Sequence, residues 1–263
     1  MQRTDDGAPT RAAASPAIER GLAILELLSA DGRARGVSEI ARELGFPKSS
    51  CHGLLETLER AGYVARGAAD TWSATLRMHL VGLQVAARGG VLREAQPLLE
   101  QLRDETGLSC HLGIRDGASI VYAAKAAPPG MVQFDTGPGK RGPLHLTAIG
   151  QVFAAWMDTA ELDRALDLSP IGGGTERAAV SRADLDRQLE TVRATGYAFE
   201  NEQEMEGVRC IAAPVFEHRG TVVAAAIGIT GLTSQITDVR VDELAQSVVA
   251  SAAELSARVS LGP

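Results

Sequence analysis

The sequence predicts an α+β protein with two domains, and three observations lead to that prediction. The chain has 263 residues, which is more than an average domain of about 150 residues requires. Residues 15–74 show three amphipathic helical patterns followed by a β-hairpin pattern. The remainder mixes strand patterns with flanking helical patterns, as expected for a largely antiparallel sheet covered by helices.

Composition and residue order limit the class of protein. The hydrophobic fraction of 45% and the charged fraction of 22% are ordinary globular values, which excludes a disordered or fibrous chain. No stretch approaches the ~18 apolar residues of a membrane span, and the polar start lacks the pattern of a secretory signal. The three cysteines are widely spaced, so we expect a reducing, cytoplasmic location without a disulfide framework.

The first domain begins with three helical patterns. Residues 1–14 form a polar tail without periodicity, and Ser15-Pro16 is typical of a helix start because serine caps the first turn and proline fits its first position. A short helix is expected over Val37 to Leu44, where Gly45 marks its end. A third helix is expected over Lys48 to Arg60.

A β-hairpin pattern follows the third helix. Residues 63–65 and 71–73 have strand character and are joined by a turn. The order of helix, short helix, tight turn, third helix and hairpin is that of a winged helix-turn-helix, whose third helix enters the DNA major groove. A generic three-helix packing unit has the same pattern and remains the alternative for residues 15–74.

The second part of the chain follows a linker helix over residues 75–90, which ends at Arg88-Gly89-Gly90. We place the domain boundary at this break, so that the second domain spans residues 91–263. Its expected helices lie at 91–105, 148–157, 159–166, 182–195 and 239–258, and its expected strands at 108–114, 119–124, 210–216 and 221–230.

The charge is unevenly distributed between the two parts. Residues 1–90 hold 11 basic and 10 acidic residues, whereas the rest of the chain holds 15 basic and 23 acidic residues. The acidic second part should not bind a polyanion. The nearly neutral first part is able to do so if its arginines share one face.

The third helix supplies the candidate DNA contacts. Its apolar residues face the core, which leaves base edges and phosphates to the side chains of its first turns. A glycine there lets the backbone approach the groove closely, and arginines on the second helix and the wing are placed to reach phosphates. The candidate residues are Lys48, Ser49, Ser50, His52, Gly53, Arg42 and Arg66.

Three segments of the chain stand out as a linked set. The first is SPAIERGLAILELLSADGRARGVSEIARELGFPKSSCHGLLETLERAGYV; the second is GPLHLTAIGQVFAAW; the third is GYAFENEQEMEGVRCIAAPVFEHRGTVVAAAIGITG. Together they resemble the IclR family of bacterial transcriptional regulators, and the second is similar to that family's PLHxTAxGK. Their order and spacing fit over about residues 15–260. The resemblance implies a GAF-like α/β effector-binding second domain, dimers or dimers of dimers, and no enzymatic activity.

Four positions depart from the family pattern. Gly53 stands where the family often has arginine, and the wing has no basic residue near Ser73. Both departures concern which bases and phosphates are contacted. Gln151 occupies the lysine position of PLHxTAxGK, and Gln203 stands where glutamate is frequent. These two concern the effector-binding domain.

The resemblance also implies a pocket for a small polar effector near the sheet. The start of the helix near Ala148 offers N–H donors to a carboxylate, so a carboxylate is the candidate effector. We interpret Cys210 as a small pocket residue rather than a nucleophile, because the sequence assigns it no catalytic partner. The implied effector-binding residues are Gly142, Ala148, Ile149, Glu200, Cys210, Gly228 and Thr230.

Other ionisable residues leave alternatives open. Glutamates alternate over residues 200–206; an extended strand would make them a cation site, whereas a loop would bond its carboxylates to backbone N–H groups. His111, His145 and Cys210 lack metal-ligand spacing, and His145 is better explained as a structural hydrogen-bonding residue. We therefore expect no metal and no cofactor.

These observations predict a regulator that binds double-stranded DNA at a near-palindromic operator, with repression favoured over activation. A small-molecule effector in the second domain would change its DNA affinity, and no membrane partner is expected. The alternative from another class is a metabolite-binding protein or enzyme with a helical N-terminal appendage. A scaffold whose winged helix binds protein is a further alternative.

Overall fold

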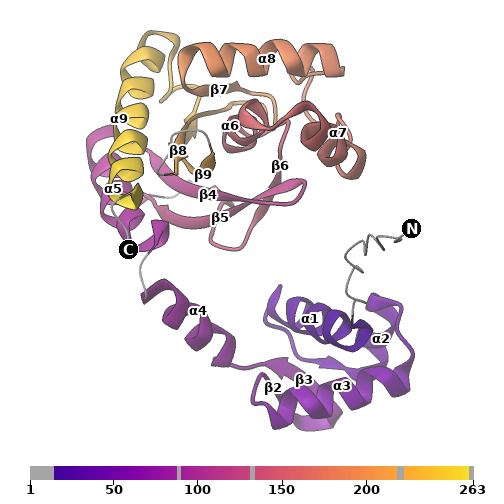
Figure 1. The fold of residues 1–263 in the computed structure, drawn as a ribbon. Coiled ribbons are helices and arrows are strands. Elements are labelled where there is room, and N and C mark those ends of the chain that lie inside the picture. The colour runs from indigo at the N-terminus through magenta and orange to yellow at the C-terminus, as the bar shows by residue number, and fades with distance from the viewer. Residues whose placement is uncertain (1–14, 88–89, 131–133, 218–221, 261–263) are drawn as a thin grey trace, which may run out of the picture. The chain divides into compact units, whose positions relative to one another are not determined.

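A computed structural model describes residues 15–87, 90–130, 134–217 and 222–260 (Figure 1). The chain divides into two compact units, Met1–Val85 and Ala86–Pro263. The predicted tail over residues 1–14 lies outside the described residues. Within the described ranges, no helix combines the length and apolar character needed to cross a membrane.

The first unit has the predicted order of helices and hairpin. A three-stranded antiparallel sheet with the order β1-β3-β2 packs beside three helices. The two-residue strand β1 is an addition to the prediction. The elements are α1 (Pro16–Ser29), β1 (Arg35–Gly36), α2 (Val37–Leu44), α3 (Lys48–Arg60), β2 (Val64–Arg66), η1 (Ala68–Asp70), β3 (Thr71–Ala74) and α4 (Arg77–Ala87).

Apolar side chains from every layer meet in the core of this unit. Ile24 of α1, Ile40 of α2, Leu55 of α3 and Trp72 of β3 are all fully buried. Helical spacing places these residues on one face of each helix, so the opposite face of α3 is left to water. Ser15 is the N-cap residue of α1, but its side chain makes no capping hydrogen bond.

The second unit contains an antiparallel six-stranded sheet with the order β6-β5-β4-β9-β8-β7. The α+β prediction is confirmed, and the short strands β6 and β7 are additions to it. The strands are β4 (Ser109–Asp116), β5 (Ser119–Ala126), β6 (Arg141–Pro143), β7 (Ala198–Asn201), β8 (Val208–Phe216) and β9 (Val223–Leu232). The helices are α5 (Val91–Thr106), α6 (Ala148–Trp156), α7 (Thr159–Leu168), α8 (Arg182–Thr195), η2 (Asp238–Arg240) and α9 (Val241–Ser260).

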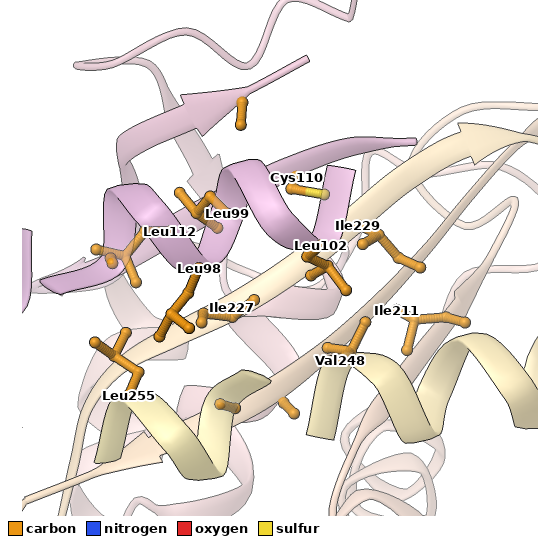
Figure 2. Packing of buried hydrophobic residues seen from close by; sticks show 14 of the residues in the cluster. Leu98, Leu99, Leu102, Cys110, Leu112, Ile211, Ile227, Ile229, Val248 and Leu255 are labelled. Carbon is orange, nitrogen blue, oxygen red and sulfur yellow. The ribbon is translucent and has the colours of Figure 1, made fainter. Parts of the chain in front are cut away.

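Helices cover both faces of this sheet. On one face, leucines of α5 and residues of α9 pack against branched residues of the strands, such as Ile211, Ile227 and Ile229 (Figure 2). Residues alternate between the two faces of a strand, and the α6 face carries the smaller Ala212 and Gly228. Small residues on that face let α6 approach the sheet closely.

Candidate nucleic-acid interface and effector cavity

The first turns of α3 present an exposed polar face. Lys48, Ser49 and Gly53 are exposed, and His52 is half-buried. The His52 ring lies with Nδ1 3.4 Å from Glu56 Oε1, one turn further along the helix. That carboxylate would repel a phosphate near His52. The N-terminal end of α3 instead has free backbone N–H groups and the positive end of the helix dipole, both of which favour an anion.

Ser50 is turned toward α1 rather than to open solvent. Its Oγ accepts a hydrogen bond from Arg20 Nη1 at 3.4 Å, and the same guanidinium lies 5.4 Å from the centre of the Phe46 ring. Arg20 therefore brings a second positive charge to the start of α3. Sequence reasoning missed Arg20, because its place depends on how α1 packs against α3.

The two other predicted arginines differ in their surroundings. Arg42 of α2 is exposed. Arg66 Nε donates to Asp70 Oδ1 at 2.7 Å, and its guanidinium lies 5.6 Å from the centre of the Trp72 ring. A phosphate must compete with Asp70 for Arg66, but an exposed ion pair of this kind is worth only ~0–1 kcal/mol.

A buried arginine fixes the connection between α1 and α2. Arg35 is buried and donates to both oxygens of Asp31, from Nη1 to Oδ1 and from Nη2 to Oδ2, at 2.8 Å each. The hydrogen bonds from Arg35 lower the pKa of Asp31 to about 2. This pair holds β1 and the start of α2 in place, which sets the position of α3 indirectly.

A small cavity lies between the N-terminus of α6 and the sheet of the second unit. Five predicted effector residues line it, and so do residues that sequence reasoning missed, among them His111 and Tyr122. Its volume is about 10 Å³, enough for a single water molecule. The five predicted residues are Ala148, Ile149, Cys210, Gly228 and Thr230.

The polar groups at this cavity are uncharged. His111 is fully buried, and burial lowers its pKa to about 3. Its Nε2 lies 3.4 Å from Thr136 Oγ1, while Nδ1 has no hydrogen-bond partner among the described residues. Burial also raises the pKa of Tyr122, which packs edge-on against the His111 ring at 5.4 Å. Both rings therefore offer neutral hydrogen-bonding groups.

Glu200 lies behind the cavity wall instead of lining it. The residue is in register with Cys210 across β7 and β8, and its Oε1 accepts hydrogen bonds from the backbone N–H groups of Gln203 and Glu204. Burial raises the pKa of Glu200 to about 7. Burial and the Glu200 charge also raise the pKa of the Cys210 thiol, whose Sγ lies 3.3 Å from Thr230 Oγ1.

The alternating glutamates do not form one extended row. The chain turns at Glu202, where φ is 59°, and Glu202 Oε2 accepts a hydrogen bond from the Gly207 N–H at 2.9 Å. A row of four carboxylates on one strand face was therefore the wrong geometry. The loop alternative, in which inward carboxylates bond to backbone N–H groups, describes Glu200 and Glu202 correctly.

Close packing explains the glycines around the cavity. A Cβ on Gly150 would lie 2.5 Å from the carbonyl oxygen of Leu144, so only glycine fits there. Gly142 does not line the cavity; it packs against Thr147. Gly228 makes room for Ile149 of α6, whose Cγ1 would lie 3.3 Å from an added Cβ.

The two unusual glutamines of the second unit contact each other. Gln151 Nε2 donates to Gln203 Oε1 at 2.7 Å and to the carbonyl oxygen of His145 at 3.3 Å. The His145 Nε2 lies 2.9 Å from the Gly172 carbonyl oxygen, as a structural histidine should. The departures at 151 and 203 are therefore one local change, in which a neutral amide pair occupies the positions of a lysine and a glutamate.

Comparisons with known proteins match both units. The family model of the IclR helix-turn-helix domain matches residues 17–68, and that of the bacterial transcriptional regulator IclR C-terminal domain matches residues 83–257. The transcriptional regulator KdgR of Escherichia coli is 32% identical over 241 residues, which cover 90% of this chain and 91% of KdgR.

Two solved structures have the same fold. An IclR transcriptional regulator from Alicyclobacillus acidocaldarius has a TM-score of 0.84 at 27% identity, with 94% of this chain and all of that chain covered. An IclR homologue from Microbacterium hydrocarbonoxydans, complexed with 4-hydroxybenzoate, has a TM-score of 0.81 at 17% identity, with 92% and 98% covered. At that identity the second likeness concerns the fold alone.

Proposed function

Because the chain belongs to the IclR family of transcriptional regulators, we propose that it represses transcription from a near-palindromic operator under the control of a small metabolite. The matching relatives are DNA-binding regulators rather than enzymes, so the enzyme alternative is set aside. The observation that carries the proposal is the exposed, basic N-terminal end of α3, framed by α1 and the wing.

Different groups on the α3 face contact the phosphates and the bases. Lys48, Arg20 and the free N–H groups of the first turn bind phosphate, which gives affinity and salt dependence. Ser49 and His52 reach base edges, which gives sequence preference. Gly53 has open space around the position of an added Cβ, so the helix can lie deep in the major groove at this point.

A second copy of the chain completes the DNA-binding unit. Four large apolar side chains of the first unit are between 55% and 77% exposed: Ile18 and Leu22 on α1, and Leu76 and Leu80 at α4. Exposed apolar residues at helical spacing are typical of a surface that another protein covers. A dimer, or a dimer of dimers, places two α3 helices on the two halves of the operator.

The small effector binds where α6 meets the sheet. The N–H groups at the start of α6 and the neutral groups of His111, Tyr122 and Thr230 suit a small acid, such as the 4-hydroxybenzoate of the Microbacterium homologue. A cavity of about 10 Å³ is too small for it, so binding must move Ile149 away from the sheet. Because the ligand fits the open cavity and not the closed one, its binding stabilises the open state.

The linker helix, over residues 75–90, transmits the opening of the cavity to the two DNA-binding units of the dimer. Arg77–Ala87 is helical, and residues 88 and 89 lie outside the described residues. The effector must bind the DNA-competent and DNA-incompetent states with different affinities, or it changes nothing. The site of action is the cytoplasm, where bacterial operator DNA lies.

Fluorescence anisotropy with DNA from upstream of the protein's own gene tests the proposal. We expect specific binding that weakens steeply with salt, and raised expression from that promoter when the gene is deleted. Binding no tighter than to competitor DNA would overturn DNA regulation. Lower expression after deletion would leave DNA binding intact but reverse repression to activation.

A further inference from the structure

A second cavity, distinct from the proposed effector cavity, lies beside α8. Its volume is about 250 Å³, against about 10 Å³ at the sheet. It lies between the buried Gln151 of α6, the α8 residues Gln188, Thr191 and Thr195, and the aromatic residues Tyr197 and Phe199. We propose that this cavity is a binding site for a small, uncharged, planar primary amide.

The charge of the lining selects an uncharged ligand. The residues that line the cavity are glutamines, threonines, one valine, one tyrosine and one phenylalanine. The lining therefore contains no acidic or basic side chain to neutralise an ion. The α8 residues of the lining lie from the middle of that helix to its C-terminal end, so the N–H groups of its N-terminus do not reach this cavity, unlike those of α6 at the sheet cavity. Removing an unpaired ion from water costs several kcal/mol in such a site, so carboxylates and ammonium compounds are disfavoured.

The glutamine pair leaves one acceptor and one donor for a ligand. Both hydrogens of Gln151 Nε2 are engaged, one by Gln203 Oε1 at 2.7 Å and one by the His145 carbonyl oxygen at 3.3 Å. Within the described part of the chain, Gln151 Oε1 and Gln203 Nε2 have no such partner. A carboxamide presents the complementary N–H donor and C=O acceptor.

The rest of the lining adds further acceptors. Thr191 directs its hydroxyl hydrogen to the Arg187 carbonyl oxygen at 3.1 Å, and Thr195 directs its own to the carbonyl oxygens of Thr191 and Tyr197, each at 2.9 Å. Gln188 Oε1 is buried without a hydrogen-bond partner among the described residues. Its amide can turn into the cavity at small cost, because the terminal torsion of glutamine is soft.

These unsatisfied acceptors favour a ligand with N–H donors over a carboxylate. A primary amide brings two N–H donors and one acceptor, whereas a carboxylate brings acceptors only. A carboxylate would leave Gln188 Oε1 and the Thr191 hydroxyl oxygen without donors, and each unsatisfied buried group costs about 1–3 kcal/mol. The amide satisfies both kinds of group.

Aromatic residues and a fixed loop prepare the site for a flat ligand. Tyr197 and Phe199 offer ring surface to a planar molecule. The backbone of Gln203 is held on both sides, since its N–H donates to Glu200 Oε1 and its carbonyl oxygen accepts the Thr175 N–H at 2.9 Å. The donor of Gln203 is therefore positioned before the ligand arrives.

Titration calorimetry with benzamide and benzoate tests the proposal, because the two probes have the same shape and differ in charge and donors. The full chain carries Thr230→Val in this experiment, which removes acid binding at the sheet cavity. We expect benzamide to bind in the range of about 0.1–1 mM, a normal affinity for so small a molecule. We expect benzoate to bind this site at least about tenfold more weakly.

Two variants assign the binding to this cavity. Gln188→Leu should weaken benzamide binding by about tenfold or more, and Gln203→Glu should do the same by adding a charge and removing a donor. Gln101→Leu is the matched control, since Gln101 is exposed on α5 and its variant should bind benzamide as the parent does. Equal binding of the two probes, no benzamide binding at about 1 mM, or full affinity in Gln188→Leu and Gln203→Glu would each overturn the proposal.

Discussion

The proposed DNA face and the proposed effector cavity differ in their exposure to water and in how their side chains are brought together. The DNA face of the first unit is exposed, and its side chains come from one helix and its immediate neighbours. The cavity of the second unit is buried, and its side chains come from β4, β5, β8, β9 and α6. A change on the exposed face should therefore alter binding and spare the fold, whereas a change at the cavity should alter both.

The largest effect is expected from replacing a glycine by alanine at the cavity, whereas the same replacement at Gly53 on the DNA face should have the smallest. Gly150→Ala places a Cβ about 2.5 Å from backbone atoms of Leu144, which cannot move away freely, so we expect a loss of about 3 kcal/mol or more in unfolding free energy. Chemical denaturation of the full chain measures it. A loss below about 1 kcal/mol would show that α6 is not held as tightly as described.

Glu200 provides the second test, because burial raises its pKa from 4.5 to about 7. A raised pKa means that the folded state binds the proton more tightly than the unfolded state. The stability from this group is complete below pH 4.5 and is lost as the pH rises through about 7. The loss is up to about 3 kcal/mol for a shift of this size.

Glu200→Gln removes that titration and keeps an acceptor for the backbone N–H groups. We expect the variant to show a flatter stability profile between pH 4.5 and 7 than the parent. Denaturant midpoints across this range measure it, with exposed Glu190→Gln of α8 as the matched control. Parallel profiles for the parent and Glu200→Gln would contradict the burial effect.

On the exposed face, Ser49→Ala should cost about 1–3 kcal/mol of operator binding if Ser49 contacts a base. Lys48→Ala should weaken binding to every DNA sequence and reduce the salt slope by about one. Neither should change the unfolding free energy by more than about 0.5 kcal/mol. Anisotropy and denaturation on the same samples separate the two effects; an unchanged operator affinity would remove Ser49 from the base contacts.

The smallest effect is expected from Gly53→Ala on the DNA face. Gly53→Ala meets open space, and alanine is a better helix former, so the variant should gain up to about 1 kcal/mol of stability. Its operator affinity should fall, because the added methyl group would lie on the face of α3 that we propose enters the groove. A gain in stability without a loss of affinity would mean that Gly53 does not face DNA.

The same division explains how much could be predicted from the sequence. The helices and hairpin of the first unit follow from local spacing, and α2 and α3 have the predicted bounds. Strand β1 has only two residues, too few for a periodic pattern. The position of Arg20 depends on packing between α1 and α3 and therefore could not be predicted from local spacing.

The cavity was less predictable because its residues meet through strand register. The family resemblance pointed to Cys210 and Thr230, which are indeed paired across β8 and β9. His111 reaches the same place because it pairs with Gly228 across β4 and β9, which no local pattern reveals. The alternation in β4, with Cys110 and Leu112 facing the α5–α9 core, is a signal that could have placed His111 on the opposite face.

The link between the two regions is tested most directly by measuring operator affinity with and without a small acid that raises the melting temperature of the chain. We predict that a saturating ligand changes the operator dissociation constant by about 5- to 150-fold, and that Thr230→Val abolishes both the thermal shift and this change. A ligand that binds at the sheet cavity and leaves operator affinity unaltered would contradict the account.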